Sequence, residues 1–462
     1  MRGDLNSQPS HLEKLGRRIL AEANDLKRTP EALANELGYE LSVIKSVISG
    51  RADLEVVQTL LSRMYAKYPI SMANLWIEQD DTIQGVKIMR AKDSSTTARV
   101  FSRKNRSDKE ADYYEYRDTV MSRTAAFKPE WIQPIRVVED NTPDNPDVAY
   151  NKGHFLHQCT FFIGEVNFYW EINGTKHCVE MNTGDSNYIT PFVPHSFTSR
   201  NNDELGVIIA VTFGGEVSNA LNEFTQIGAH SIEAITDNLK NGIEAFRSRL
   251  ERYLNAESLG KSEFTNRLTK AGMRWDQASE IVGGKVLPSK KQIEVVAKVL
   301  NLREQDLFVS SIDTGDLVII KHSQEIDSRP FPNSNRPDYK LKELARTRHL
   351  PYLRGLDITV LENSYDDRSR FCHHLHEYIY NYGEIPIFLS WADNRTELIQ
   401  PGDSVYIQPM ISHSFAIKET DRLGHLVSVR IPGTLTDSVI NEFSRYPPDF
   451  RNRAIQETDK WF

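Results

Sequence analysis

Apolar and polar positions alternate with two different periods along the chain. In residues 28–61, and again in residues 274–300, apolar side chains recur three and four positions apart, which predicts short amphipathic helices. Gly38 interrupts the first series and Gly283 the second, as expected where one helix ends and the next begins. Each series therefore predicts a compact helix-turn-helix bundle.

Residues 150–215 and 370–433 follow a different pattern. They contain runs such as CTFFIGEVNFYWEI and YIYNYGEIPIFLSW, which are rich in aromatic and β-branched residues and are punctuated by Gly, Asn and Asp. No long helical period interrupts either segment. We therefore predict several short strands in each segment, closed into a double-stranded jelly roll (a double-stranded β-helix) with a central cavity.

The two β-type segments also repeat in sequence. HFLHQ at 154–158 and GDSNYITPFVPHSF at 184–197 match HHLHE at 373–377 and GDSVYIQPMISHSF at 402–415. His154 and His373 lie 219 residues apart, and His195 and His413 lie 218 apart, an offset that chance alone seldom preserves. The sequence thus predicts an α+β protein that arose by tandem duplication of a helical bundle and a β-domain. The predicted borders are 1–90 for the first bundle, 91–235 for the first β-domain, 236–322 for the second bundle and 323–462 for the second β-domain.

Composition narrows the classes of protein that remain. The 462 residues carry 56 Lys and Arg against 64 Asp and Glu, a formal net charge of −8, which disfavours a protein built to wrap nucleic acid. Three cysteines are too few and too scattered for a disulfide framework or a CxxC zinc site. The sequence contains no apolar run of the roughly 20 residues that span a membrane, and its first 15 residues lack the apolar core of a signal peptide. We expect a soluble, cytoplasmic protein without nucleic-acid or membrane partners.

Three positions in each β-type segment carry side chains that can bind a metal ion. His154 and Gln158 are four residues apart, so on a strand they share one face, and His195 follows on a later segment. Two imidazoles and one oxygen donor leave open positions on an octahedral ion, as in the facial triad of non-haem Fe(II) oxygenases. One histidine in a strand is more often packed or exposed than a ligand, but the pattern recurs in the second copy. A possible second metal site there consists of His373, Glu377 and His413.

The chain resembles the phosphonate-processing non-haem iron cupin oxygenases. That family includes hydroxypropylphosphonate epoxidase, hydroxyethylphosphonate dioxygenase and methylphosphonate synthase. The resemblance rests on the bundle-plus-cupin plan, the H-x₃-[E/Q] pair and the later GD…P…H segment, and it covers most of the chain. In the family, a glutamine four residues after the first histidine marks methylphosphonate synthase, and Gln158 stands there. The dioxygenase takes a carboxylate from just before the last histidine, where SNYITPFVP has neither Asp nor Glu.

The resemblance implies a cofactor, a substrate and a reaction. The cofactor is Fe(II), the substrates are 2-hydroxyethylphosphonate and O₂, and the carbon–carbon bond is cleaved without 2-oxoglutarate. The products are methylphosphonate and CO₂ or bicarbonate, and the assembly is a homo-oligomer. The alternative within the family is a hydroxyethylphosphonate dioxygenase that gives hydroxymethylphosphonate and formate.

The resemblance also implies further site residues. Asn151 stands three residues before the first histidine, where the family has an asparagine that contacts the phosphonate or the bound oxygen species. The family's paired-tyrosine strand corresponds to DYYEY, with Tyr116 favoured over Tyr114. A lysine from the bundle corresponds to Lys27, or one position later to Arg28. A basic residue that binds phosphonate precedes the tyrosines, and the choice there is open between Arg106 and Lys109. Lys27, Tyr116 and Asn151 are the predicted catalytic residues.

Comparison of the two copies predicts which one is active. In the second copy Asn151 is replaced by Arg370, the DYYEY strand becomes DYKLK, and the counterpart of Lys27 falls near Met273. We therefore expect catalysis in the first β-domain and a degenerate substrate site in the second.

Two other classes share parts of this pattern. A helix-turn-helix bundle joined to a cupin is also the plan of ligand-sensing transcription regulators. The first bundle's recognition segment, ELSVIKSVISGRADLE, has few basic residues, and two bundles in one acidic chain fit DNA poorly. A zinc- or manganese-dependent isomerase of the cupin type is the second alternative, and Asn151 with DYYEY argues against it.

Overall fold

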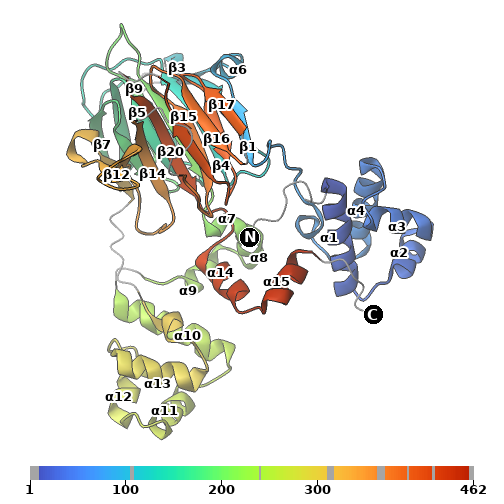
Figure 1. Cartoon of the computed structure of the whole chain (residues 1–462). Coiled ribbons are helices and arrows are strands. Elements are labelled where there is room, and N and C mark those ends of the chain that lie inside the picture. The colour runs from blue at the N-terminus through green and yellow to red at the C-terminus, as the bar shows by residue number, and fades with distance from the viewer. Residues whose placement is uncertain are drawn as a thin grey trace. The chain divides into compact units, whose positions relative to one another are not determined.

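The computed structural model describes residues 10–104, 109–238, 241–309, 317–361, 370–392, 395–418 and 422–456 (Figure 1). The chain divides into two compact units, Met1–Phe213 together with Ile320–Phe462, and Gly214–Ile319. The first unit contains a helical bundle and two β-domains, and the second unit is helical.

The N-terminal bundle forms where the sequence predicts helices. Ser10 and Glu13 make a reciprocal capping box at the start of the first helix, and Thr29 caps the second, which begins with Pro30. The second helix ends at Gly38, whose φ of +71° favours glycine. Leu15, Ile19 and other buried apolar residues form the core of the bundle. The helices are α1 (His11–Asp25), α2 (Pro30–Leu37), α3 (Leu41–Ile48), α4 (Leu54–Lys67) and α5 (Met72–Leu75).

The first β-domain consists of a seven-stranded and a three-stranded sheet. The strand order is β11-β8-β5-β10-β4-β3-β2 in the larger sheet and β7-β6-β9 in the smaller one. The described strand pairs are antiparallel, and their inward-facing aromatic residues, such as Phe162, Phe168 and Phe197, are buried. The strands are β2 (Arg99–Lys104), β3 (Glu110–Asp118), β4 (Phe127–Pro134), β5 (His157–Ile163), β6 (Val166–Ile172), β7 (Thr175–Met181), β8 (Ser186–Ile189), β9 (His195–Ser199), β10 (Val207–Phe213) and β11 (Val318–Lys321).

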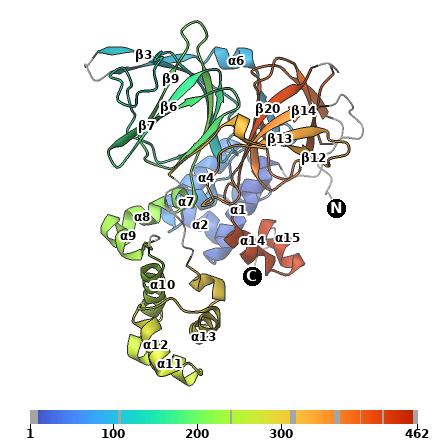
Figure 2. The same cartoon turned by 90° about the vertical axis from the view of Figure 1, so that its left-hand side faces the viewer.

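The second β-domain repeats this plan. Its larger sheet has the order β1-β18-β15-β20-β14-β13-β12 and its smaller sheet β17-β16-β19, so the strands correspond one to one with those of the first. Figure 2 shows β6, β7 and β9 of the first β-domain on one side and β12, β13 and β14 of the second on the other. The elements are β1 (Val86–Met89), α6 (Ala91–Ser95), η3 (Ser323–Glu325), β12 (Arg329–Phe331), β13 (Tyr339–Glu343), β14 (Arg354–Val360), β15 (His376–Asn381), β16 (Ile387–Trp391), β17 (Arg395–Ile399), β18 (Ser404–Ile407), β19 (His413–Ala416) and β20 (Gly424–Ile431).

The two β-domains exchange one strand each. Strand β1 precedes the first β-domain in sequence but pairs with β18 of the second, and β11 precedes the second but lies beside β8 of the first. The Asp of each repeated GD pair anchors the exchange: Asp403 accepts a hydrogen bond from the Ala91 amide, and Asp185 accepts one from the Ser323 amide, both at 2.8 Å. The borders predicted at 90/91 and 322/323 fall just after these strands, so the sequence assigned each strand to the preceding bundle.

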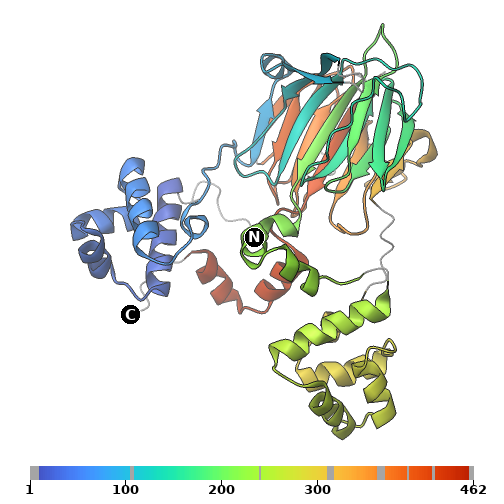
Figure 3. The same cartoon turned by 180° about the vertical axis from the view of Figure 1, so that it is seen from behind.

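The second unit is a separate group of helices. The first β-domain ends with β10, and residues 216–235, which the sequence assigned to that domain, form three short helices instead. Phe246, Phe264 and Leu268 lie in the core of the following bundle, whose helices are drawn in yellow-green in Figure 3. The helices are α7 (Glu216–Asn219), α8 (Leu221–Ile227), α9 (Ala229–Ile235), α10 (Gly242–Ala256), α11 (Lys261–Lys270), α12 (Trp275–Val282), α13 (Lys290–Leu300) and η2 (Glu304–Leu307).

Two further helices, α14 (Asp437–Ser444) and α15 (Pro448–Ile455), follow the second β-domain. Among the helices described, not one has both the length and the apolar character needed to cross a bilayer.

Candidate active site

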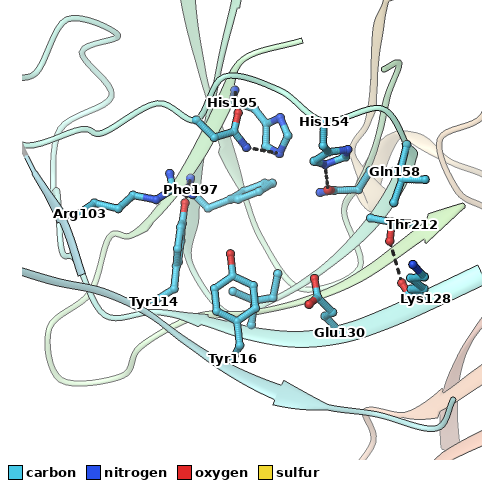
Figure 4. Close-up of a pocket in the computed structure, with 13 residues that line it drawn as sticks. Arg103, Tyr114, Tyr116, Lys128, Glu130, His154, Gln158, His195, Phe197 and Thr212 are labelled. Carbon is cyan, nitrogen blue, oxygen red and sulfur yellow. Dashed lines mark hydrogen bonds between the residues drawn. The ribbon is translucent and has the colours of Figure 1, made fainter. Parts of the chain in front are cut away.

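The first β-domain encloses a cavity of about 300 Å³. Figure 4 shows His154, Gln158 and His195 along one side of it and Tyr114, Tyr116 and Glu130 along the other. Six residues predicted from sequence meet here. The cavity is lined by Arg103, Tyr114, Tyr116, Lys128, Glu130, Ile132, Asn151, His154, Leu156, Gln158, His195, Phe197 and Thr212.

The three predicted metal ligands converge on this cavity from different elements. Gln158 is the second residue of β5 and His195 is the first of β9, whereas His154 precedes β5, which begins at His157. The prediction that His154 and Gln158 share a strand is therefore wrong, because the chain is still in a loop at His154. Their side chains nevertheless meet, with His154 Nε2 3.1 Å from Gln158 Oε1, and the His154 and His195 ring centroids are 5.3 Å apart.

Hydrogen bonds and burial prepare His195 to bind a metal ion. Its Nδ1 lies 2.8 Å from the Val193 carbonyl oxygen, which can only accept, so Nδ1 carries the proton and Nε2 keeps its lone pair. Burial lowers the pKa of His195 to about 4, so the ring is neutral at pH 7. His154 Nδ1 is buried without a hydrogen-bond partner among the described residues. Two imidazole nitrogens and an amide oxygen are donors that suit Fe(II).

Thr160 orients the Gln158 amide. The Gln158 Nε2 donates to Thr160 Oγ1 at 2.9 Å, which leaves Oε1 directed toward His154. Thr160 lies two residues further along β5, on the same face of the strand. A neutral oxygen donor is thus held in place where the second β-domain has a carboxylate.

Asn151 joins the loop that carries His154 to the strand that carries His195. Its Oδ1 accepts from the amides of Gly153 at 2.9 Å and His195 at 2.8 Å. Its Nδ2 lies 3.0 Å from His195 Nε2, so the amide NH₂ group faces the nitrogen that would bind the metal. This placement supports the role predicted for Asn151 as a donor to a ligand in the cavity.

The two tyrosines predicted from DYYEY have different surroundings. The Tyr114 hydroxyl accepts a hydrogen bond from the Phe197 amide at 2.8 Å, which ties β3 to β9. The Tyr116 hydroxyl points into the cavity (Figure 4), and burial together with the neighbouring Tyr114 raises its pKa, so it stays a protonated donor. Tyr116 is therefore better placed than Tyr114 to bind an anion.

Two basic residues line the cavity, Arg103 and Lys128, and sequence reasoning missed both. Arg103 lies on β2, its Nη1 donates to the Ala149 carbonyl at 2.8 Å, and its guanidinium carbon is 4.7 Å from the centre of the Tyr114 ring. The sequence feature that could have indicated Arg103 is the strand RVFSRK, in which Arg99, Phe101 and Arg103 share one face. These residues line an adjoining cavity, also of about 300 Å³, together with Ser102, Tyr114, Tyr116 and Glu130.

The other predicted basic residues lie elsewhere or outside the described residues. Lys27 directly follows the C-cap of α1 with a φ of +59°, and its Nζ donates to the carbonyls of Asn24 and Asp25 at 3.3 and 3.4 Å. It does not line the cavity. Lys109 is exposed and immediately precedes β3, and Arg106 lies outside the described residues.

The second β-domain fills the corresponding space with apolar side chains. Phe371, not Arg370, takes the place of Asn151. The Phe371 amide donates to the His413 carbonyl, just as the Asn151 amide donates to the His195 carbonyl. The expected replacement by Arg370 is wrong, since this loop is one residue shorter in the second copy. Leu341 pairs with Ile358 as Tyr116 pairs with Ile132, so leucine replaces the cavity tyrosine. Both Phe371 and Leu341 belong to the hydrophobic core of this domain.

In the second His–Glu–His set both imidazoles lie against one carboxylate, and the Nε2 atom of His413 is buried without a hydrogen-bond partner among the described residues. Glu377 Oε2 lies 3.0 Å from both His373 Nε2 and His413 Nε2. Burial by itself would raise the Glu377 pKa, but Arg430, His413 and His373 together hold it well below its ordinary value. Within the described part of the chain, no group of three or more His, Cys, Asp or Glu side chains is arranged to hold a metal ion.

Comparison with known proteins identifies the family. No family model matches the chain. A methylphosphonate synthase of Nitrosopumilus maritimus (strain SCM1) is 35% identical over 459 residues, which are 98% of this chain and 96% of the relative. An (S)-2-hydroxypropylphosphonic acid epoxidase of Streptomyces wedmorensis is 31% identical over 104 residues, 22% of this chain and 50% of the relative.

Solved structures agree with the sequence relatives. A Streptomyces albus HEPD with 2-hydroxyethylphosphonate and Fe(II) bound superposes with a TM-score of 0.86 at 32% identity and covers 98% of this chain and 99% of that one. The sequence relatives and this neighbour are enzymes. The chain belongs to the family of methylphosphonate synthase.

Proposed function

We propose that this protein is an Fe(II)- and O₂-dependent oxygenase that converts 2-hydroxyethylphosphonate to methylphosphonate and CO₂ or bicarbonate. The observation that carries the proposal is the cluster of His154, Gln158 and His195 on a cavity that also contains Arg103. The chain's 35% identity to a methylphosphonate synthase supports this activity, and the HEPD neighbour supports the substrate and the metal.

The donor set fits Fe(II), which when bound would supply the centre for O₂ activation. His154, Gln158 and His195 would hold the metal, with Nε2 of each histidine and Oε1 of the glutamine as the donor atoms. The phosphonate is bound by the Arg103 guanidinium and the Tyr116 hydroxyl through charge-assisted hydrogen bonds. Asn151 donates its amide NH₂ to the ligand and keeps His195 in position through the His195 amide. Lys27, Arg106 and Lys109 stay proposed as further sources of positive charge for the phosphonate.

The substrate itself supplies the electrons. One 2-hydroxyethylphosphonate and one O₂ give one methylphosphonate, one CO₂ and one water, so the four electrons that reduce O₂ come from the carbinol carbon. The carbon bonded to phosphorus keeps that bond and gains a hydrogen. No 2-oxoglutarate or external reductant is therefore needed. One 2-hydroxyethylphosphonate and one O₂ can also give one hydroxymethylphosphonate and one formate, which is a balanced reaction too. This second candidate outcome is the one that the HEPD neighbour favours.

Phosphorus NMR of an aerobic reaction tests the proposal directly. The Fe(II)-loaded protein is mixed with 2-hydroxyethylphosphonate and no cosubstrate, and a methylphosphonate signal is expected. A hydroxymethylphosphonate signal would keep the site but overturn the assigned product. Unchanged substrate with iron bound would overturn the assigned substrate.

The Gln158→Glu variant tests the role of the neutral ligand. Because a carboxylate lowers the positive charge of the metal centre by one unit, the ratio of methylphosphonate to hydroxymethylphosphonate is expected to change. Gln133→Glu on β4, which makes the same substitution outside the cavity, is the matched control and should leave the ratio unaltered. An identical ratio in Gln158→Glu, with iron still bound, would contradict this role.

We further propose that both β-domains are cupin barrels and that both bundles are of the helix-turn-helix type, so that the chain is a tandem duplication. The matching strand orders of the two larger sheets support this reading. In this duplication the first β-domain is the catalytic one, because Phe371 and Leu341 occupy the corresponding substrate space in the second β-domain. The borders proposed from sequence place these domains at 1–90, 91–235, 236–322 and 323–462.

A homo-oligomer is also proposed, on the evidence of α14 and α15. Neither helix has a buried residue, and both expose apolar side chains, among them Val439, Ile440 and Phe450. Light scattering should give at least twice the 52.9 kDa of one chain. The Val439→Asp/Phe450→Asp variant should shift the mass toward one chain, whereas Asn452→Asp should not. A wild-type mass of 52.9 kDa would refute the proposal.

A further inference from the structure

The strand registers place an arginine in the second β-domain where the first has a threonine. In the first, Gln158 on β5 lies directly opposite Thr212 on β10, and Thr212 lines the cavity. In the second, Glu377 on β15 lies directly opposite Arg430 on β20. Side chains at directly opposed positions of an antiparallel pair lie on the same face of the sheet. Arg430 therefore occupies the position next to Glu377 that corresponds to the position of Thr212 next to Gln158.

Arg430 is bound to Glu377 by a buried ion pair. Its Nε donates to Glu377 Oε1 at 2.8 Å, and Ser428 Oγ donates to the same oxygen at 2.5 Å. The Glu377 side chain is 0% exposed and that of Arg430 is 12% exposed. Because the other oxygen, Oε2, contacts both histidines, the carboxylate has no oxygen left without a polar partner.

Phe371 holds the guanidinium in this position. The Arg430 guanidinium carbon lies 5.1 Å from the centre of the Phe371 ring, which stacks on His413 with centroids 5.6 Å apart. A divalent cation placed among the two histidines and Glu377 would have the guanidinium as a like-charged neighbour in a site of low dielectric constant. It would also compete with the arginine for a single carboxylate.

We propose that the positively charged Arg430 prevents the second β-domain from binding a metal ion. The three ligand residues, His373, Glu377 and His413, are all retained there. In the first β-domain the corresponding Thr212 is uncharged and short, and it leaves the site open. It follows that the Arg430→Thr substitution, which introduces the residue of the first β-domain, creates a second metal site in the chain.

The test measures Co(II), whose visible absorption reports nitrogen ligation. The full-length His154→Ala/His195→Ala variant, in which the first site is disabled, is dialysed anaerobically against Co(II), and the bound metal is counted by mass spectrometry. This variant is expected to bind no Co(II) in stoichiometric amount. With Arg430→Thr added, about one Co(II) per chain is expected, together with a rise in thermal midpoint when Co(II) is present.

Two controls locate the new site. His413→Ala, added to the Arg430→Thr variant, should abolish the Co(II) that Arg430→Thr admits. Arg354→Thr should admit none, because Arg354 lies opposite Arg430 on β14 but donates to the carbonyls of Pro351 and Leu353 instead of to Glu377.

Two results would overturn the proposal. One is stoichiometric Co(II) in the second β-domain while Arg430 is present. The other is no Co(II) in an Arg430→Thr variant whose circular dichroism is that of the parent. If threonine prevents folding, Arg430→Gln, which keeps bulk and removes the charge, provides the same comparison. Since no readout depends on turnover, the result is independent of whether the proposed reaction is correct.

Discussion

The His195→Ala variant is expected to lose both bound iron and turnover. His195 is 4% exposed, its tautomer is set by the Val193 carbonyl, and its ring centroid lies 5.3 Å from that of His154 on the same side of the cavity. Removing a direct ligand should reduce metal affinity by more than the roughly 10- to 100-fold that loss of an outer-shell partner costs. Iron per chain, measured after anaerobic loading, should fall to near zero, and the phosphorus NMR product signal should disappear with it.

Two comparison variants make this result specific. His177→Ala on β7 removes a histidine that stacks on Trp170 at 5.0 Å, outside the cavity, and should retain iron and turnover. His413→Ala removes the corresponding residue of the second β-domain and should retain the iron of the first. A folded His195→Ala protein that still binds iron and forms product would refute the assigned ligand set. Loss of product in His413→Ala with the first iron intact would refute catalysis in the first β-domain.

The Arg103→Ala variant is expected to bind phosphonate weakly. A hydrogen bond to a charged group contributes about 1.5–3 kcal/mol, which corresponds to a KM raised by roughly 10- to 100-fold. Turnover at saturating substrate should change less, since Arg103 is placed to contact the phosphonate and not the carbon–carbon bond that breaks. Arg103→Lys should recover only part of the loss, because an ammonium cannot bind two oxygens with the planar geometry of a guanidinium. Steady-state kinetics and anaerobic calorimetry of 2-hydroxyethylphosphonate binding measure these effects.

The matched control for Arg103 is Arg117. Its guanidinium carbon lies 4.0 Å from the centre of the Trp131 ring, and its Nε pairs with Glu115 at 2.6 Å, away from the residues that line the cavity. Arg117→Ala should leave KM nearly unchanged. Lys109→Ala and Arg106→Ala, the two positions favoured by sequence, should raise KM less than Arg103→Ala does. A larger effect at Lys109 or Arg106 would transfer the phosphonate contact to that residue.

Much of the site follows from local patterns. The spacing of His154, Gln158 and His195, and its recurrence at an almost constant offset, predicted residues that the fold does bring together. Asn151 and Tyr116 were indicated by the resemblance to the phosphonate-processing oxygenases and not by a local pattern, and both line the cavity. The helices of the first bundle were also predictable, because the apolar period, Thr29 and Pro30 at the start of α2, and Gly38 at its end are all encoded within a few residues.

Other features depend on which strands lie side by side, and no local pattern encodes that. Arg103 reaches the cavity because β2 pairs with β3, and the residues around Arg103 in the sequence do not specify which strand lies beside β2. The exchange of β1 and β11 rests on hydrogen bonds to Asp403 and Asp185, residues far away in sequence.

The second His–Glu–His set shows most clearly which features the sequence determines and which depend on the tertiary structure. Its three ligands were visible in the sequence as a repeat of the first set, because residue types and spacing are properties of the chain. Arg430 and Phe371 became relevant only in the folded protein, where strand pairing sets one opposite Glu377 and packing sets the other against His413. Side-chain types therefore specified which groups could bind a metal, whereas strand register determined which charged neighbour each group received.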